Sequence, residues 1–215
     1  MSTAEETAGG EAAAWGEVTP DAARRLLIAA VEAFAERGYH ATTTRDIAGR
    51  AGMSPAALYI HYKTKEELLH RISRIGHEKA VDILRTAARG EGTPAERLAD
   101  AVSSFVRWHA GGRTPARVVQ YELDSLGPDA REEILALRRQ CDAEVRGIIE
   151  DGIACGEFDV LDVKRTTLAV LSLSIDVARW FNVHGPWTPD EVGALYADLV
   201  LRMVGAEPSG ATAQR

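Results

Sequence analysis

The chain has 215 residues, of which 46% are hydrophobic and 27% are charged, and its formal net charge is −7. This composition allows a buried core, but no run of about 18 or more consecutive apolar residues occurs, which argues against a membrane-spanning helix. The acidic N-terminus lacks the basic start and apolar block of a signal peptide, so we expect a cytoplasmic protein with no membrane partner.

The charge is unevenly distributed along the chain. Residues 20–75 contain nine Lys or Arg and six Asp or Glu, a net charge of +3, whereas residues 1–19 carry −4 and the remaining 140 residues carry −6. A basic segment in an otherwise acidic chain is typical of a protein that presents one surface to nucleic acid and turns the rest away from it.

The two cysteines indicate neither a disulfide nor a metal site. Cys141 and Cys155 are 14 residues apart in one predicted helix, which separates them by about 21 Å, too far for a disulfide. Cys141 lies on an apolar stripe, so we interpret it as a buried thiol rather than a redox switch. No Cys/His cluster has the spacing of metal ligands, and we expect no metal and no cofactor.

Residues 1–19 are rich in Ala, Glu, Gly and Thr, and we expect them to form a disordered acidic tail. Its one aromatic residue, Trp15, could dock on the folded body without marking a site. The first helix begins near Pro20-Asp21 and ends at Gly38, which suits the left-handed conformation past a helix end. Its apolar face is formed by Leu27, Ala30, Val31 and Phe34.

Two short helices with capped starts follow. Thr43 and Asp46 form a capping box, in which the Thr hydroxyl accepts from the Asp amide and the carboxylate reaches back, and this helix ends at Gly52. Ser54 is the N-cap of the next helix, with Pro55 at its first position. Two capped short helices separated by a tight turn predict a helix-turn-helix, which places one helix in a DNA groove.

The rest of the chain predicts further helices and no strands. Thr64-Lys65-Glu66-Glu67 is another capping box, which opens a long helix to about Arg89. Glycines and prolines separate the helices that follow, at about 94–110, 114–126, 129–155, 162–184 and 188–204. No stretch alternates convincingly with a period of two. We therefore expect an all-α fold with about nine helices.

The run TTTRDIAGRAGMSPAALYIHYKTKEEL, residues 42–68, closely resembles the DNA-binding domain of the TetR family of bacterial transcriptional regulators. The matching residues are Thr42-Thr43, Asp46-Ile47-Ala48, Ala51-Gly52-Met53-Ser54, Leu58-Tyr59-Ile60-His61-Tyr62 and Lys65-Glu66-Glu67-Leu68. The helical layout extends the resemblance to most of the chain. It implies a DNA-binding domain over 20–66, a ligand-binding and dimerisation domain over 67–205 and a disordered tail over 206–215.

By this resemblance, Thr43, Tyr59, His61 and Lys65 should contact phosphates, and Arg45 and the exposed face of residues 54–62 should lie nearest the bases. The alternatives are a core role for Tyr59 and a plain surface role for His61. The expected DNA surface comprises Thr43, Thr44, Arg45, Ser54, Pro55, Ala56, Ala57, Tyr59, His61, Tyr62 and Lys65. A helix N-terminus at Thr43 and a cation at Lys65 both suit anionic oxygen.

Ala56 and Ala57 give the predicted recognition helix few hydrogen-bonding groups for reading bases. The family often has Gly at the position of Ala56. A methyl group can meet a thymine methyl, but Arg or Asn would be needed for strong hydrogen-bonded readout. We therefore expect specificity to come from Arg45, from DNA shape and from dimer geometry.

The middle helices should enclose a small-molecule effector, with a few polar anchors in an apolar setting. The candidate ligand-binding residues are Phe105, Trp108, His109, Tyr121, Cys141, Ile175, Arg179 and Trp180. For each, the alternative is a core or surface role. Residues 179–188, with Tyr196 and Leu199, also loosely resemble TetR-type regulators of fatty-acid and steroid catabolism, several of which sense acyl-coenzyme A thioesters.

One helix-turn-helix reads too few bases, so we expect a homodimer on a palindromic double-stranded operator with half-sites about 34–36 Å apart. In the family the last two helices form a four-helix bundle across a two-fold axis. The expected interface residues are Tyr196, Leu199 and Met203, against a plain core role. The favoured mechanism is repression relieved by ligand; the sequence leaves an activator role open.

Other functions were weighed against this one. An enzyme would need a nucleophile, base or metal constellation, and no G-x-S-x-G, HExxH or phosphate-binding glycine loop occurs, so we expect no enzyme and no catalytic residues. A non-specific architectural DNA-binding protein would depend on basic surface, which the acidic bulk lacks. Within the family, the alternative is a regulator of drug efflux that senses a xenobiotic.

Overall fold

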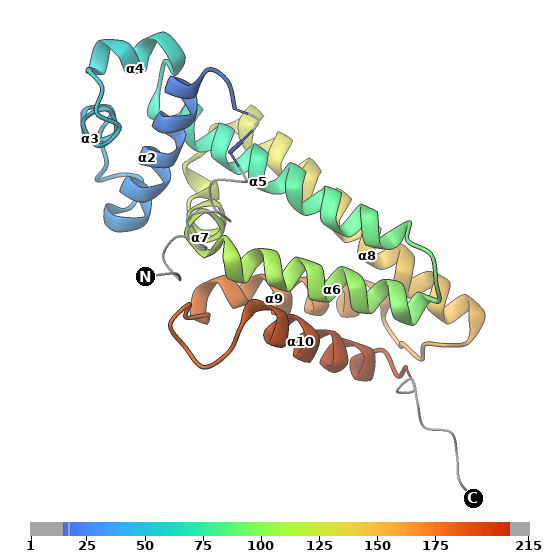
Figure 1. The fold of residues 1–215 in the computed structure, drawn as a ribbon. Helices are drawn as coiled ribbons and strands as arrows, with labels where there is room; N and C mark the ends of the chain where they lie inside the picture. The colour runs from blue at the N-terminus through green and yellow to red at the C-terminus, as the bar shows by residue number, and fades with distance from the viewer. Residues whose placement is uncertain (1–14, 17, 207–215) are drawn as a thin grey trace, which may run out of the picture. The chain divides into compact units, whose positions relative to one another are not determined.

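The computed structural model describes residues 15–16 and 18–206, and every regular element among them is helical. This part of the chain contains nine α-helices, which Figure 1 labels, and one 3₁₀-helix, η1: α2 (Asp21–Arg37), α3 (Thr44–Arg50), α4 (Pro55–His61), α5 (Lys65–Ala88), α6 (Pro94–Gly111), α7 (Arg113–Tyr121), η1 (Leu123–Ser125), α8 (Pro128–Cys155), α9 (Val163–Trp180) and α10 (Pro189–Met203). The predicted all-α fold is confirmed. None of the described helices is long and apolar enough to cross a membrane.

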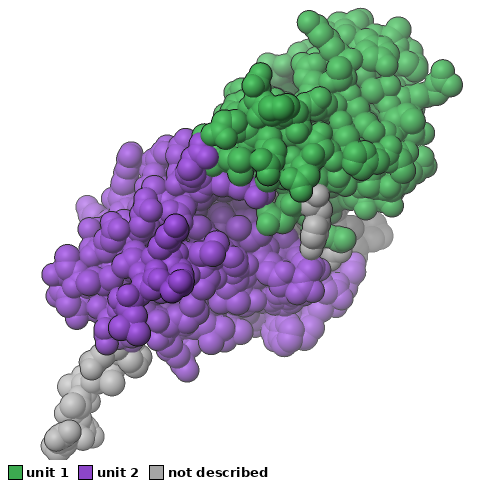
Figure 2. All heavy atoms as spheres, turned by 180° about the vertical axis from the view of Figure 1, so that it is seen from behind, with its two compact units in different colours: residues 1–79, 111–137 green, residues 80–110, 138–215 purple. Residues whose placement is uncertain are grey.

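The chain forms two compact units, coloured separately in Figure 2. Unit 1 consists of residues 1–79 and 111–137, and unit 2 consists of residues 80–110 and 138–215. Helices α5 and α8 each contribute residues to both units, because the division falls inside them.

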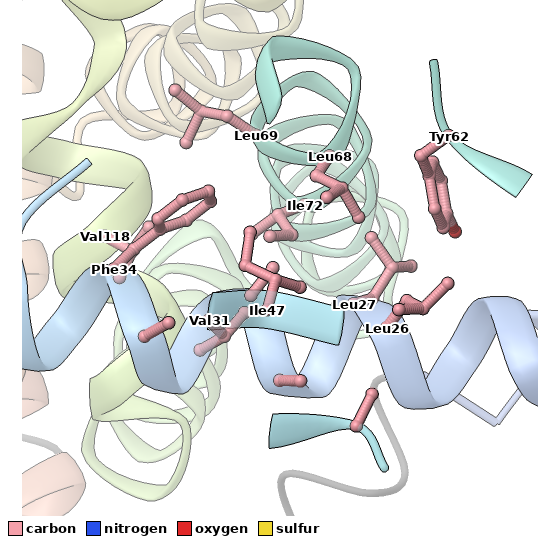
Figure 3. Packing of buried hydrophobic residues seen from close by; sticks show 14 of the residues in the cluster. Leu26, Leu27, Val31, Phe34, Ile47, Tyr62, Leu68, Leu69, Ile72 and Val118 are labelled. Carbon is pink, nitrogen blue, oxygen red and sulfur yellow. The ribbon is translucent and has the colours of Figure 1, made fainter. Parts of the chain in front are cut away.

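The core of unit 1 draws on residues well beyond the helix-turn-helix segment. Leu27 of α2 and Ile47 of α3 belong to one buried cluster with Ile72 of α5 and Val118 of α7, as Figure 3 shows. Short amphipathic helices such as α3 and α4 gain most of their stability from packing of this kind. The compact unit therefore extends beyond the range of 20–66 that we expected for the DNA-binding domain, because α7 and the first half of α5 complete its core.

Trp15 and Val18 belong to the same cluster, with exposed fractions of only 3% and 8%. The amide of Val18 donates to the carbonyl oxygen of Trp15 at 3.0 Å, which closes a turn. Both residues fall in the predicted tail, but burial of the indole and the valine side chain offsets the entropy cost of ordering them. Residues 1–14 and 17, and the predicted tail from 207 onward, lie outside the described residues.

The capped starts of α3 and α4 are confirmed. The hydroxyl of Thr43 accepts from the Asp46 amide at 3.2 Å, and the Asp46 carboxylate accepts from the Thr43 amide at 2.9 Å. The hydroxyl of Ser54 accepts from the Ala57 amide at 3.2 Å and caps α4, with Pro55 at its first position. Between these helices Gly52 has a φ of 67°, a left-handed conformation that carries no Cβ penalty for glycine.

The junctions around α5 and α7 differ from the predictions. The hydroxyl of Thr64 accepts from the Glu67 amide at 3.0 Å, but the Glu67 carboxylate accepts from the amide of Lys63, at 2.7 Å, instead of closing the box on Thr64. The helix expected over 114–126 ends at Tyr121. Tighter hydrogen bonds, three residues apart, then form η1.

The helix expected over 162–184 ends at Trp180. The side chain of Asn182 accepts from the amide of His184 at 3.0 Å, and its carbonyl oxygen accepts from the amide of Gly185 at 2.8 Å. These local bonds compete with helical ones and terminate α9 early.

In unit 2, two glycines allow close packing. A Cβ atom on Gly193 of α10 would lie 2.8 Å from the carbonyl oxygen of Ser103 on α6, so α10 approaches the α6 backbone there. A Cβ atom on Gly152 of α8 would lie 2.1 Å from the ring of Phe158, which packs on that glycine. Neither position has room for a larger residue in this arrangement.

Candidate nucleic-acid interface and ligand site

The exposed residues of α3 and α4, with the capping residues before them, form the candidate nucleic-acid surface of unit 1. Thr44 on α3 and Tyr59 on α4 join the two helices through a hydrogen bond between their hydroxyls at 3.1 Å. Hydroxyl groups held in this way can bond phosphate oxygens without carrying sequence information. Of the other predicted contacts, Thr43, Arg45, Ser54, Pro55 and Ala56 are exposed, and Ala57 and His61 are half-buried.

The negative charge of the Asp46 carboxylate is stabilised by neighbouring groups at the start of α3. It accepts from the hydroxyl of Thr43 at 2.6 Å and from the Thr43 amide at 2.9 Å, and these bonds keep the pKa of Asp46 below its usual value. A guanidinium nitrogen of Arg37 lies 3.5 Å from the same carboxylate. Arg50 pairs with two glutamates of α2, so the exposed Arg45 is the cation of α3 best placed to reach DNA.

Lys65 is turned toward the backbone between α2 and α3. Its ammonium group donates to the carbonyl oxygens of Tyr39 and Thr42 at 2.7 and 2.8 Å, and it lies 3.4 Å from that of His40. It also lies 4.2 Å from the centre of the Tyr39 ring, a cation–π contact. These partners occupy its donors, so the geometry assigns Lys65 to the turn and does not support the predicted phosphate contact.

Tyr62 lies apart from the surface as well. It is buried, and its hydroxyl donates to the carbonyl oxygen of Ala23 at 3.3 Å. Burial raises the pKa of its phenol. Helix α4 ends at His61, and the extended backbone of Tyr62 turns its ring into the core of unit 1. This corrects our prediction that Tyr62 contacts DNA.

Two exposed residues near this surface were not named among the predicted contacts, although Ile60 lies in the range 54–62 whose exposed face we expected nearest the bases. Ile60 of α4 is 79% exposed, and Lys63 follows just after the helix with an exposed side chain. The spacing of four residues from Ala56 could have placed Ile60 on the same face of the helix. The position of Lys63 between two predicted helices could have marked it as an accessible cation.

Three of the predicted ligand-binding residues form a compact aromatic cluster on α6 in unit 2. The ring centre of His109 lies 4.3 Å from that of Phe105 and 4.7 Å from that of Trp108, both edge-on. Phe105 and His109 are buried, and Trp108 is half-buried. Nδ1 of His109 lies 2.8 Å from the carbonyl oxygen of Phe105, a bond within the helix that orients the ring. The cluster offers apolar rings with a polar group among them, as effector sites do.

The other predicted ligand residues divide between the interior and the surface. Cys141 is buried, and burial raises the pKa of its thiol to about 11, so the thiol stays protonated at neutral pH, as expected of a structural cysteine. Ile175 is half-buried, whereas the side chain of Tyr121 is not among those described. No group of three or more His, Cys, Asp or Glu side chains in the described part of the chain is arranged to hold a metal ion.

Arg179 and Trp180 lie on the exposed side of α9. The guanidinium of Arg179 forms two bonds of 2.7 Å with the carboxylate of Asp176, one turn earlier, and the pKa of that carboxyl is lowered by this pair. Trp180 is 37% exposed and stacks on Tyr196 of α10, with ring centres 6.3 Å apart. These two residues therefore lie apart from the buried cluster on α6, and Trp180 contacts one of the predicted interface residues, Tyr196.

Exposed apolar side chains follow α9 and α10. Leu199 and Met203, two of the predicted interface residues, are 40% and 44% exposed, and Leu195 on the same helix is 54% exposed. Tyr196 is half-buried. Leucine and methionine side chains spaced at four residues form a stripe along α10 that unit 2 itself does not cover.

The chain matches two family models, one described as bacterial regulatory proteins, tetR family, over residues 26–72 and one described as tetracyclin repressor-like, C-terminal domain, over residues 91–204. A crystal structure of a tetR-family bacterial regulatory protein from Rhodococcus RHA1 is 44% identical, with a TM-score of 0.84, and the match covers 88% of this chain and 100% of that one.

Two curated relatives are also similar. The HTH-type transcriptional repressor KstR2 of Mycolicibacterium smegmatis is 31% identical over 185 residues, 82% of this chain and 87% of the relative. The fatty acid metabolism regulator protein of Bacillus subtilis is 29% identical over 141 residues, 65% of this chain and 73% of the relative. With matching family models in both parts of the sequence, the chain belongs to the TetR family of DNA-binding bacterial transcriptional regulators.

Proposed function

We propose that the chain is a repressor that binds a palindromic operator as a homodimer and is released by a small hydrophobic effector. The observation that carries the DNA-binding part is the surface of α3 and α4, where the Thr44–Tyr59 hydroxyl pair and Arg45 are accessible together. This surface lies in the segment of the chain with net positive charge.

The effector part is supported by the cluster of Phe105, Trp108 and His109 on α6, which groups aromatic rings around an imidazole in unit 2. Acyl-coenzyme A thioesters are the first effector class to test, because one relative is named a fatty acid metabolism regulator protein. A ligand that favours one arrangement of the dimer over another by about 1–3 kcal/mol would change operator affinity roughly 5- to 150-fold.

DNA binding is tested by selection of the full-length protein on a pool of random double-stranded DNA, followed by gel shifts of the enriched duplex with random competitor. We expect a palindromic consensus that resists competition. Arg45→Ala should weaken binding to it, whereas Arg165→Ala, an exposed arginine at the start of α9, serves as the matched control. Equal competition by random DNA would instead favour a non-specific architectural role.

The effector is tested by titrating acyl-coenzyme A thioesters of increasing chain length into the complex with the selected duplex, with free coenzyme A as the control. Release by one chain-length range, but not by free coenzyme A, is the expected result. A thioester that binds tightly and leaves operator affinity unchanged is not the effector. Transcription from a promoter that contains the duplex should fall when the protein is added; a rise would identify an activator.

A further inference from the structure

Among the described residues of unit 1, Ile60 has the most exposed large apolar side chain, at 79%. It follows Leu58, which is completely buried, by two residues on α4. Because each residue of an α-helix turns by about 100°, these two side chains leave the helix in nearly opposite directions. The packing of Leu58 in the core therefore directs Ile60 outward, away from the buried cluster of the unit.

Ile60 shares its face of α4 with two alanines. By the same helical rotation, Ala56 lies within about 40° of Ile60 and Ala57 within about 60° on the other side. Ala56 is exposed and Ala57 is half-buried. The three residues form a continuous apolar strip along the helix, with Ile60 as its largest member.

The groups around this strip favour DNA as its occupant. Tyr59 directly precedes Ile60 on α4 and bonds its hydroxyl to that of Thr44, and the exposed cations Arg45 and Lys63 belong to α3 and to the residues after α4. Polar and cationic groups beside an apolar strip suit a groove with phosphates at its edges and base edges at its floor. The apolar group that the floor of the major groove offers is the C5-methyl of thymine.

We propose that Ile60 is a specificity-determining residue that reads a thymine methyl group in each operator half-site, with Ala56 and Ala57 completing the apolar contact. The proposal rests on the proposed DNA-binding function and deepens it. It replaces the expectation that this helix contributes little to base readout, because the alanines alone offer far less apolar surface than a branched four-carbon side chain. At this position the protein would then discriminate against base pairs that lack the thymine methyl group. This discrimination would come from apolar contact and not from hydrogen bonds.

The test combines a side-chain change with the removal of one methyl group from the DNA. The duplex selected by the full-length wild-type protein is prepared with each thymine replaced in turn by deoxyuridine, which removes only the C5-methyl. At one symmetric position per half-site, we expect the replacement to weaken wild-type binding about three- to fivefold, as for loss of one buried methyl group. Ile60→Ala should bind the thymine and deoxyuridine duplexes equally at that position. Ile60→Val should keep part of the preference.

The matched control is Ile153→Ala, which makes the same change at an exposed isoleucine of α8 and should retain the full wild-type response to deoxyuridine. The proposal is overturned if every deoxyuridine duplex weakens wild type and Ile60→Ala by the same factor. It is also overturned if Ile60→Ala changes the oligomeric state and not the methyl preference, since a second copy would then cover the strip. If the wild-type protein selects no consensus at all, the proposed function fails instead.

Discussion

At the scale of single residues, Lys65 lies near the candidate DNA-binding surface but directs its ammonium group to the protein's own backbone. Its ammonium group is held by backbone carbonyl oxygens between α2 and α3 and by the ring of Tyr39. Carbonyl groups in a turn have no helical partners, so a long side chain that returns to them stabilises the turn itself. Lys63, two residues earlier, has an exposed side chain and provides a direct comparison.

We predict that Lys65→Met lowers the free energy of unfolding by about 1–3 kcal/mol, because the carbonyl oxygens lose a charged donor. Urea unfolding of the full-length protein measures this. The dependence of DNA affinity on salt should stay unchanged for Lys65→Met. Lys63→Met should instead leave stability unchanged and lower the salt slope by about 0.9 if its ammonium meets one phosphate. If Lys65→Met left the urea midpoint unchanged and lowered the slope of DNA affinity against salt, Lys65 would contact a phosphate and would not stabilise the turn.

At the scale of helices, the same capping box begins α3 and α10. Hydrogen bonds from Thr43 lower the pKa of Asp46, and hydrogen bonds from Thr188 lower the pKa of Glu191. The unfolded chain therefore binds these protons at higher pH than the folded chain. Their contribution to stability is complete above the ordinary carboxyl values of 3.8 and 4.5 and is lost as the pH falls through the lowered folded values.

Asp46→Asn keeps an oxygen acceptor for the Thr43 amide but removes the titrating group. We predict that the urea midpoint of this variant falls less steeply than that of wild type as the pH is lowered from about 5 to 2. Glu191→Gln tests the equivalent box on α10 in the same way. A variant with the wild-type pH dependence would show that its carboxyl has no lowered pKa in the folded protein.

Helix α8 contains two glycines with opposite surroundings. A Cβ atom on Gly152 would overlap the ring of Phe158, whereas one on Gly147 would meet nothing within 4 Å. We predict that Gly152→Ala lowers the free energy of unfolding by about 1–3 kcal/mol through this overlap. Gly147→Ala should raise it by about 0.5–1 kcal/mol, because alanine favours the helix. Thermal or urea unfolding measures both, and equal effects of the two changes would contradict the packing of Phe158 on Gly152.

Sequence patterns within a few consecutive residues predicted the positions of the helices better than they predicted the contacts between helices. A helix cap lies within four consecutive residues, so the capping boxes of α3 and α10 and the Ser54 cap of α4 are local features of the sequence. The partners of Lys65 and Tyr62 could not be predicted from such patterns, because they lie 26 and 39 residues away along the chain. Similarly, the amide of Tyr39 donates to the carboxylate of Glu122, 83 residues later, at 3.0 Å. The pair of Tyr39 and Glu122 depends on the position of α7 in unit 1, which no local pattern shows.

At the scale of the whole molecule, the last two helices of the described chain, α9 and α10, carry exposed apolar side chains. Leu168 of α9 is 63% exposed, and Leu195, Leu199 and Met203 of α10 are also exposed. A two-fold symmetric contact buries the same patch on both copies, and a dimeric helix-turn-helix protein needs a fixed spacing between its reading heads. The proposed homodimer accounts for this surface.

We predict that Leu199→Asp converts the protein to a monomer, because a carboxylate would be buried without a partner at the contact. Sedimentation velocity measures the oligomeric state, and gel shifts on the selected palindrome measure the consequence. Affinity for the full palindrome should fall toward that for a half-site, since one helix-turn-helix cannot span both half-sites. Leu161→Asp is the matched control, because Leu161 is fully exposed between α8 and α9 and should tolerate the charge. A Leu199→Asp variant that remains dimeric and binds the palindrome like wild type would place the interface elsewhere on the chain.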